Sequence, residues 1–295
     1  MLNVIPTDDT NRFDVIPGKA WTQGFATFGG YVAASALRAA TLAGHDRLLL
    51  SAQVNYLAPS PVEGYSVSID ALRVGKGTSV VEARVTCPNP KDPEAAPILS
   101  AQIVFTYGVP RPTSVGVTSC LDPSQLTQFA EQANQDPNMP MLPGVPPFLH
   151  QFDFKPLVGA RPFEGLDSVE HAWTIRPKQP LEMSAQEYAL LMSDTNPPPV
   201  ISLVDKVTPG STLSWFVSFE HPQPSNVADG WIYVLMHQDS AAESFGSHAT
   251  ALFDAQGRHL TSNRQITAFF EPEVTAPNSK TIARQFKFAG NDDSA

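Results

Sequence analysis

A helix that is apolar on every side constrains this chain more than any other feature of its sequence. Residues 28–40 are rich in alanine and almost uncharged. Alanine is the best helix former, and a helix that is apolar all round is usually buried. Gly29 and Gly30 stand at its start, where they let another backbone approach closely. The rest of the chain must therefore enclose this helix.

Strand-like segments follow this helix. Four β-rich runs are separated by Pro and Gly breaks, at residues 48–57, 65–73, 79–87 and 98–107. One buried helix followed by several antiparallel strands predicts an α+β unit, with the sheet wrapped around the helix.

The second half of the chain repeats this order. A helix-like stretch at 184–193 precedes β-rich runs at 212–220, 231–237, 248–253 and 259–270. The turn at 254–257 predicts a hairpin between the last two runs. A constant shift of 163 residues sets Pro59 on Pro222, Gln102 on Gln265 and Tyr31 opposite Asp194. We interpret the shared order as a duplication.

A segment rich in Pro, Ser, Gln and Asn separates the two halves, and one short helix is expected in it at 124–133. The predicted boundaries are an N-terminal domain at 1–110, a linker at 111–147 and a C-terminal domain at 148–273. Residues 274–295 form a polar tail that we expect to be mobile at its end.

The overall composition narrows the choice of partners and compartment. The net charge of -10 argues against nucleic acid and against an anionic membrane surface. Cys87 and Cys120 are the two cysteines, so neither a disulfide framework nor a thiol-rich metal site is expected. Residues 1–17 contain no apolar core of signal-peptide length, and no apolar run reaches the roughly 18 residues that a membrane-spanning helix needs. We therefore expect a soluble, cytoplasmic protein.

The order helix, strands, linker, helix, strands resembles the acyl-CoA thioesterase II-like double-hotdog family. The resemblance covers residues 20–272. It depends on the order and spacing of the motifs more than on any single motif. The stretches that carry it lie at 28–34, 56–61, 72–79, 193–194, 212–222, 231, 253–258 and 265. It implies two tandem hotdog domains, each an antiparallel sheet wrapped around a central helix.

The resemblance also implies a reaction, the hydrolysis of an acyl-CoA thioester to free acid and CoA, which belongs to lipid metabolism. In the family an Asp, a Thr and a Gln of the second hotdog position the attacking water, and the matching residues here are Asp194, Thr212 and Gln265. A carboxylate can act as general base on water. Backbone N–H groups at a helix start suit the oxyanion. The reaction needs no metal and no redox cofactor.

Asp194 also has a structural interpretation. It precedes Thr195, Asn196 and a run of prolines, and Asp before prolines commonly starts a turn. The 163-residue shift sets Tyr31 at the corresponding place of the first half. We therefore expect one active site in each chain.

Thr212 lies in a β-rich run where threonine is ordinarily favoured by β-propensity. Alternation places it on one face with Phe216, and Leu213 and Trp215 on the other. The family often has an Asp-His-Ser-like triplet just after this Thr, where this chain has Ser214, Trp215 and Phe216. Trp215 and Phe216 are therefore predicted to narrow the acyl pocket.

Gln265 shares its predicted face with Thr261, Asn263, Thr267 and Phe269. Apart from catalysis, such a residue could belong to a solvated sheet face. The matched Gln102 has no neighbouring Asp, so we take it as structural or as a relic.

The sequence Gly-Lys-Gly at 75–77 is a candidate for contact with the CoA phosphates, through Arg73 and Lys76. An ordinary basic hairpin turn is the alternative, because the spacing of a P-loop is missing. The seven histidines are scattered without metal-ligand spacing. The chain also lacks a Gly-x-Ser-x-Gly nucleophile elbow.

Two other functions compete with hydrolysis. One is a non-catalytic acyl-CoA or lipid-binding protein, since the triplet after Thr212 is absent. The other is an enoyl-CoA hydratase. Hydratases of related folds usually have a His a few residues after the Asp, whereas Asp194 is followed here by Thr195, Asn196 and three prolines. A double hotdog already contains the pair that single hotdogs form by dimerising, so a monomer is feasible. Further pairing is common in the family, so a homo-oligomer is also expected.

Overall fold

The computed structural model describes residues 2–92, 94–114, 116, 119–135, 138–139, 145–166, 168–220 and 230–270. Its first half contains α1 (Gly29–Leu42), β5 (Leu48–Tyr56), β6 (Tyr65–Val74), β7 (Thr78–Cys87) and β8 (Ile98–Gly108). Its second half contains α3 (Ala185–Met192), β11 (Gly210–Phe219), β12 (Ile232–Ala242), β13 (Phe245–Phe253) and β14 (His259–Phe269). All of these elements were predicted from the sequence, and the α+β class is confirmed.

Several shorter elements were not predicted. They are β1 (Val4–Pro6), β2 (Arg12–Val15), β3 (Thr22–Gln23), β4 (Ala26–Thr27), β9 (Phe152–Val158), β10 (Glu170–Pro177) and the 3-10 helices η1 (Lys19–Trp21), η2 (Pro147–Gln151) and η3 (Pro199–Ser202). Strands β1, β2, β9 and β10 extend the two ends of the sheet, so each half has more strands than the sequence indicated.

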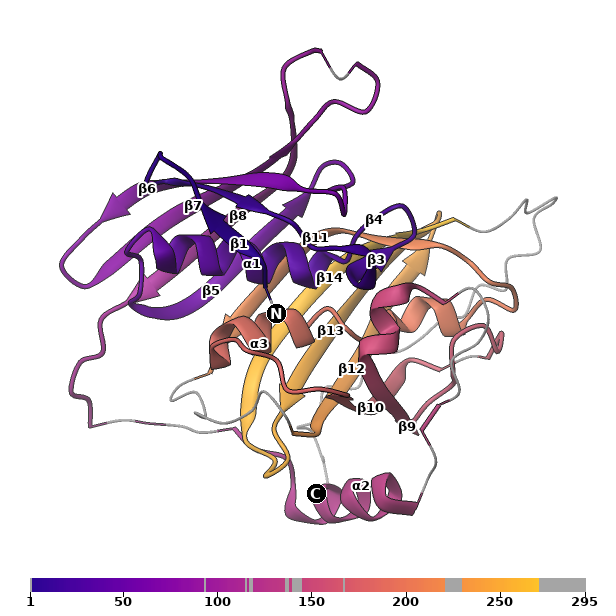
Figure 1. The fold of residues 1–295 in the computed structure, drawn as a ribbon. Coiled ribbons are helices and arrows are strands. Elements are labelled where there is room, and N and C mark those ends of the chain that lie inside the picture. The colour runs from indigo at the N-terminus through magenta and orange to yellow at the C-terminus, as the bar shows by residue number, and fades with distance from the viewer. Residues whose placement is uncertain are drawn as a thin grey trace.

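In the described part of the chain, one twelve-stranded antiparallel sheet joins both halves. Its order is β1-β2-β6-β7-β8-β5-β11-β14-β13-β12-β10-β9, and β3 pairs with β4 separately. Strands β5 and β11 form the seam, with Val54 opposite Trp215. Figure 1 shows the two halves side by side, with α1 and α3 on the same face of the sheet. We call this face, which packs against the helices, the inner face.

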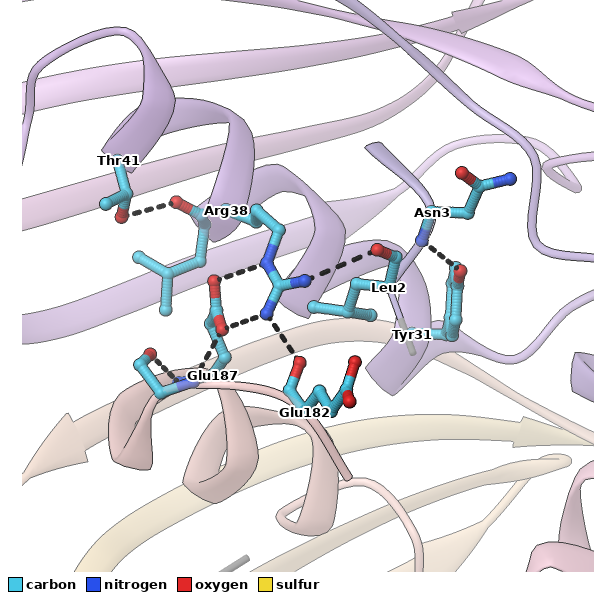
Figure 2. A network of polar contacts seen from close by, with 9 residues as sticks. Leu2, Asn3, Tyr31, Arg38, Thr41, Glu182 and Glu187 are labelled. Carbon is cyan, nitrogen blue, oxygen red and sulfur yellow. Dashed lines mark hydrogen bonds and ion pairs between the residues drawn. The ribbon is translucent and has the colours of Figure 1, made fainter. Parts of the chain in front are cut away.

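Helices α1 and α3 are antiparallel neighbours. A Cβ added to Gly30 in the first turn of α1 would lie 2.7 Å from the Leu191 carbonyl oxygen near the end of α3. At the other end, Arg38 Nη2 lies 2.7 Å from Glu187 Oε2 and Arg38 Nε lies 3.0 Å from Oε1 (Figure 2). Glu187 also accepts from the Ser184 backbone N–H in a capping box. This bidentate ion pair fixes the register that brings the start of α1 to the end of α3.

Helix α2 (Pro123–Gln135) contains the predicted short helix and packs on the opposite, outer face of the sheet. Phe129 and Ala133 from the helix form a small apolar cluster with sheet residues such as Tyr233 and Phe253. The predicted hairpin at 254–257 is confirmed, since Gly257 N–H donates to the Asp254 carbonyl at 2.9 Å and Gly257 has a φ of 76°. The predicted tail and Pro222 lie outside the described residues.

The constant 163-residue shift is wrong in two places. Gln102 is half-buried beside Ile103, which points into the core, whereas Gln265 points inward and its neighbour Ile266 is 45% exposed. A slip of one residue turns every side chain of a strand to the other face, so the two glutamines are not equivalent. Tyr31 lies in the first turn of α1, whereas Asp194 lies beyond the end of α3. Tyr31 is therefore not the counterpart of Asp194.

Candidate active site

Asp194 stands two residues beyond the last residue of α3, in a short segment held by hydrogen bonds. The Ser193 hydroxyl donates to the Ala189 carbonyl at 2.7 Å, and the Thr195 hydroxyl donates to the Leu191 carbonyl at 3.0 Å. Both bonds return to the last turns of α3, and they tie the residues on either side of Asp194 to the helix. The prolines after Asn196 then prevent the helix from continuing.

Three donors surround the carboxylate of Asp194. Gln265 Nε2 donates to Oδ1 at 2.8 Å. The Thr212 hydroxyl and the backbone N–H of Gly30 also form hydrogen bonds to the carboxylate. The fold thus brings Asp194, Thr212 and Gln265 together, and it adds the start of α1 from the first half of the chain.

Burial raises the pKa of Asp194 from its ordinary value of 3.8 to about 7, and the bonds from Gln265, Gly30 and Thr212 oppose this shift. Protein surrounds the carboxylate, while the residue as a whole keeps some exposed surface. A carboxylic acid with a pKa near neutrality can take a proton from water and return it.

Gly29 and Tyr56 complete the site from the first half. A Cβ on Gly29 would lie 2.7 Å from Asp194 Oδ2 and 2.9 Å from the Tyr56 hydroxyl oxygen, so only glycine leaves both oxygens in place. Tyr56 is the last residue of β5, next to the seam. Sequence reasoning did not assign a role to Tyr56, although the stretch 56–61 was among the motifs of the resemblance.

The position of Thr212 corrects the predicted alternation. The pairing of β11 with β14 shifts between Thr212 and Ser214, which leaves Leu213 as a β-bulge. The extra residue turns Thr212 toward Asp194, on the inner face that Trp215 also occupies, while Phe216 points outward. The prediction that Thr212 and Phe216 share a face is therefore wrong.

The face that carries Gln265 is buried. Thr261, Asn263 and Thr267 share this face with Gln265 as predicted, and all four are at most 5% exposed. The interpretation of this row as a solvated sheet face is wrong, because α3 and the segment after it cover this part of the sheet.

Trp215 and Phe216 point to opposite sides of the sheet. Trp215 is 1% exposed and is paired with Gln265 across β11 and β14, so it lies beside the site. Phe216 is 48% exposed and lines a groove of about 440 Å³ on the outer face. The structure therefore does not bring Phe216 to Asp194.

Arg73 and Lys76 also lie away from this site. Arg73 lies near the end of β6 and Lys76 in the β6–β7 turn, where the Gly75 carbonyl accepts from Arg47 Nη1 at 2.8 Å. Arg47 precedes the first residue of β5, whereas Tyr56 ends that strand. Nine residues of strand put this turn roughly 30 Å from Tyr56.

Two further observations concern metals and membranes. Among the described residues, no three His, Cys, Asp or Glu side chains converge in a way that could hold a metal ion. Within the same ranges, no helix has both the length and the apolar character needed to cross a membrane.

Comparison with known proteins relates this chain to a family. Residues 17–106 match the family model for the acyl-CoA thioesterase N-terminal domain, and residues 123–269 match the one for the acyl-CoA thioesterase C-terminal domain. No curated protein gave a match.

Solved structures with similar folds cover almost the whole chain. A hot dog fold protein of unknown function from Alicyclobacillus acidocaldarius is 15% identical, with a TM-score of 0.71 over 92% of this chain and 97% of that one. An acyl-CoA thioesterase II from Mycobacterium marinum is 14% identical, with a TM-score of 0.65 over 94% and 98%. A trans-AT PKS dehydratase domain from Brevibacillus brevis is 11% identical, with a TM-score of 0.61 over 92% and 97%. At these identities the likeness establishes the fold, and the predicted tandem hotdog fold is confirmed.

Proposed function

This chain belongs to the acyl-CoA thioesterase family of thioester hydrolases, and we propose that it hydrolyses an acyl-CoA to the free acid and CoA with Asp194 as general base. The observation that carries the proposal is the carboxylate of Asp194, which is held by Gln265, Thr212 and Gly30 and has a pKa of about 7.

In the proposed reaction, Asp194 takes a proton from a water molecule that Thr212 and Gln265 also contact. The water oxygen bonds to the thioester carbon, and the π electrons of the C=O bond move to the carbonyl oxygen. When the C=O bond forms again, the C–S bond breaks and Asp194 returns the proton to the CoA sulfur. Atoms and charges balance without any other reactant.

The surroundings of Asp194 support this assignment over a purely structural role. An Asp that only ended a helix or started a turn would be expected at the surface, where its pKa stays low. Here burial raises the pKa of Asp194 to about 7, which costs folding free energy. The N-terminus of α1 also faces the site, and its partial positive charge favours an oxyanion.

A thiol-release assay across acyl-CoA chain lengths tests the proposal, with wild type and Asp194→Asn compared. We expect Asp194→Asn to lower kcat by about 10²- to 10⁴-fold, the usual contribution of a general base. Undiminished hydrolysis by this variant would contradict the mechanism. Tight acyl-CoA binding without turnover by wild type would favour a binding protein, and loss of enoyl absorbance with an enoyl-CoA would favour a hydratase.

A further inference from the structure

The hydroxyl of Tyr56 is buried beside Asp194 and forms no hydrogen bond with any described residue. The hydroxyl oxygen and Asp194 Oδ2 both lie within 2.9 Å of the point that a side chain on Gly29 would occupy. The Tyr56 hydroxyl oxygen and Asp194 Oδ2 are therefore separated by at most the sum of 2.9 Å and 2.7 Å. Buried hydroxyl groups are nearly always satisfied, because an unsatisfied one destabilises the folded protein. The described residues therefore supply no hydrogen-bond partner for this hydroxyl.

We propose that Tyr56 is a catalytic residue whose hydroxyl donates a hydrogen bond to the carbonyl oxygen of the bound thioester and stabilises the oxyanion. This inference rests on the proposed function and deepens it. The substrate then supplies the missing partner. Each half of the chain then contributes one catalytic residue, because Tyr56 belongs to β5 in the first half and Asp194 follows α3 in the second.

The ionisation of the two groups fits this division. Burial, followed by the nearby charge of Asp194, raises the pKa of Tyr56 well above its ordinary value of 10.0. Tyr56 therefore keeps its proton at neutral pH and can only donate to an oxyanion. Asp194 is the group that exchanges a proton with the water and with the CoA sulfur, so Tyr56 ends each cycle in the state in which it began.

The substitution Tyr56→Phe tests the inference because it removes one oxygen atom and leaves the ring. The Tyr56 hydroxyl forms no hydrogen bond with the described part of the chain, so the variant should be at least as stable as wild type. We expect kcat to fall by about 10²- to 10³-fold, as for other oxyanion donors, while KM rises by no more than about 10-fold. A Tyr56→Phe enzyme with the kcat of wild type would overturn the inference.

Tyr107→Phe is the matched control. The Tyr107 hydroxyl is also buried and has no hydrogen-bond partner among the described residues. Tyr107 pairs with Leu49 near the start of β5, at the other end of the strand from Tyr56. We expect this variant to retain the wild-type kcat, which would separate the position of Tyr56 from the general effect of removing a buried hydroxyl.

Binding of two inert analogues isolates the contact with the carbonyl oxygen. In a ketone analogue CH₂ replaces the sulfur and the carbonyl remains, whereas a thioether analogue lacks the carbonyl oxygen. Tyr56→Phe should raise the Kd of the ketone analogue by about 2- to 10-fold, the usual effect of one neutral hydrogen bond, and leave the Kd of the thioether analogue unchanged. Equal effects on both analogues would overturn the inference.

The experiments distinguish failure of this inference from failure of the proposed function. If Asp194→Asn lowers kcat as expected and Tyr56→Phe leaves kcat unchanged, the inference on Tyr56 fails and the thioesterase proposal stands. If wild type hydrolyses no acyl-CoA, the proposed function fails. The two analogues then still decide whether Tyr56 contacts the carbonyl oxygen.

Discussion

The inner faces of the two halves occupy similar places in the fold but differ in chemistry. In the first half the middle of the sheet presents apolar side chains to α1, among them Val67, Ile69, Val81, Ala83, Ile103 and Phe105, each at most 2% exposed. In the second half the corresponding region presents His248, Thr250, Asn263, Gln265 and Thr267, each at most 5% exposed. Apolar burial in the first half contributes free energy of folding, whereas buried polar groups usually cost it.

Several of these buried polar side chains of the second half lack a hydrogen-bond partner within the described part of the chain. Thr250 Oγ1, Thr267 Oγ1 and both polar atoms of the Asn263 side chain have no hydrogen-bond partner there. Burial lowers the pKa of His248 to about 4, so its ring is neutral at physiological pH. The half that contains Asp194 is therefore organised around a polar site, and the apolar half supplies much of the stability that this arrangement needs.

The largest effect is expected from the apolar half. Phe105 is fully buried, and Phe105→Ala should lower the free energy of unfolding by about 3–5 kcal/mol through lost burial and the cavity left behind. Urea denaturation monitored by circular dichroism measures it. Thr250→Ala is the matched change in the polar half, where we expect a loss of no more than about 1 kcal/mol. Equal losses of unfolding free energy in the two variants would show that the two inner faces contribute equally to stability.

Asp194→Asn should stabilise the protein at alkaline pH although it lowers kcat. Because the pKa of Asp194 is raised from 3.8 to about 7, the folded state binds its proton more tightly than the unfolded state. Its contribution to stability therefore declines as pH rises from about 4 to about 7 and stays low above that range. Replacement by Asn should raise the free energy of unfolding by up to about 4 kcal/mol at pH 8.

Urea denaturation of both proteins at pH 4 and at pH 8 checks this sign. The difference between wild type and Asp194→Asn should be largest at pH 8 and should vanish near pH 4. A variant that is less stable than wild type at pH 8 would indicate that the bonds from Gln265, Thr212 and Gly30 outweigh the burial of the charge.

The smallest effect concerns a single polar residue of the second half. Asn263→Leu keeps the size of the side chain and removes two buried polar atoms without partners, so it should stabilise the protein by about 1 kcal/mol. The reciprocal change, Ile103→Asn in the apolar half, should destabilise the protein. If Asn263→Leu is also destabilising, ordered water satisfies Asn263, and the contrast between the two faces is smaller than the contacts indicate.

The sequence predicted the main elements because their periodicities are strong. The all-apolar helix at 28–40 and the alternating runs needed no knowledge of the tertiary structure. It could not predict the face of Thr212, because the bulge at Leu213 depends on pairing with β14. It also could not reveal that Phe216 and the basic turn at 75–77 lie away from Asp194, since distances between elements depend on the order of strands in the sheet.

Asp194 and Gln265 were matched through the resemblance, and the fold places Gln265 Nε2 2.8 Å from Asp194 Oδ1. Tyr56 was missed because a tyrosine at the end of a strand is ordinary in sequence. Only the tertiary structure shows that the hydroxyl of Tyr56, a residue of the first half, faces the carboxylate of Asp194 in the second half.

The seam between β5 and β11 gives the molecule a property that neither half has alone. Gly29, Gly30 and Tyr56 stand on one side of it, and Asp194, Thr212 and Gln265 on the other. If the chain were cut between the two halves, the fragments would each carry an incomplete set of groups around the carboxylate. Turnover would then report reassembly of the pair, so this protein could serve as a split enzyme whose signal measures association in solution.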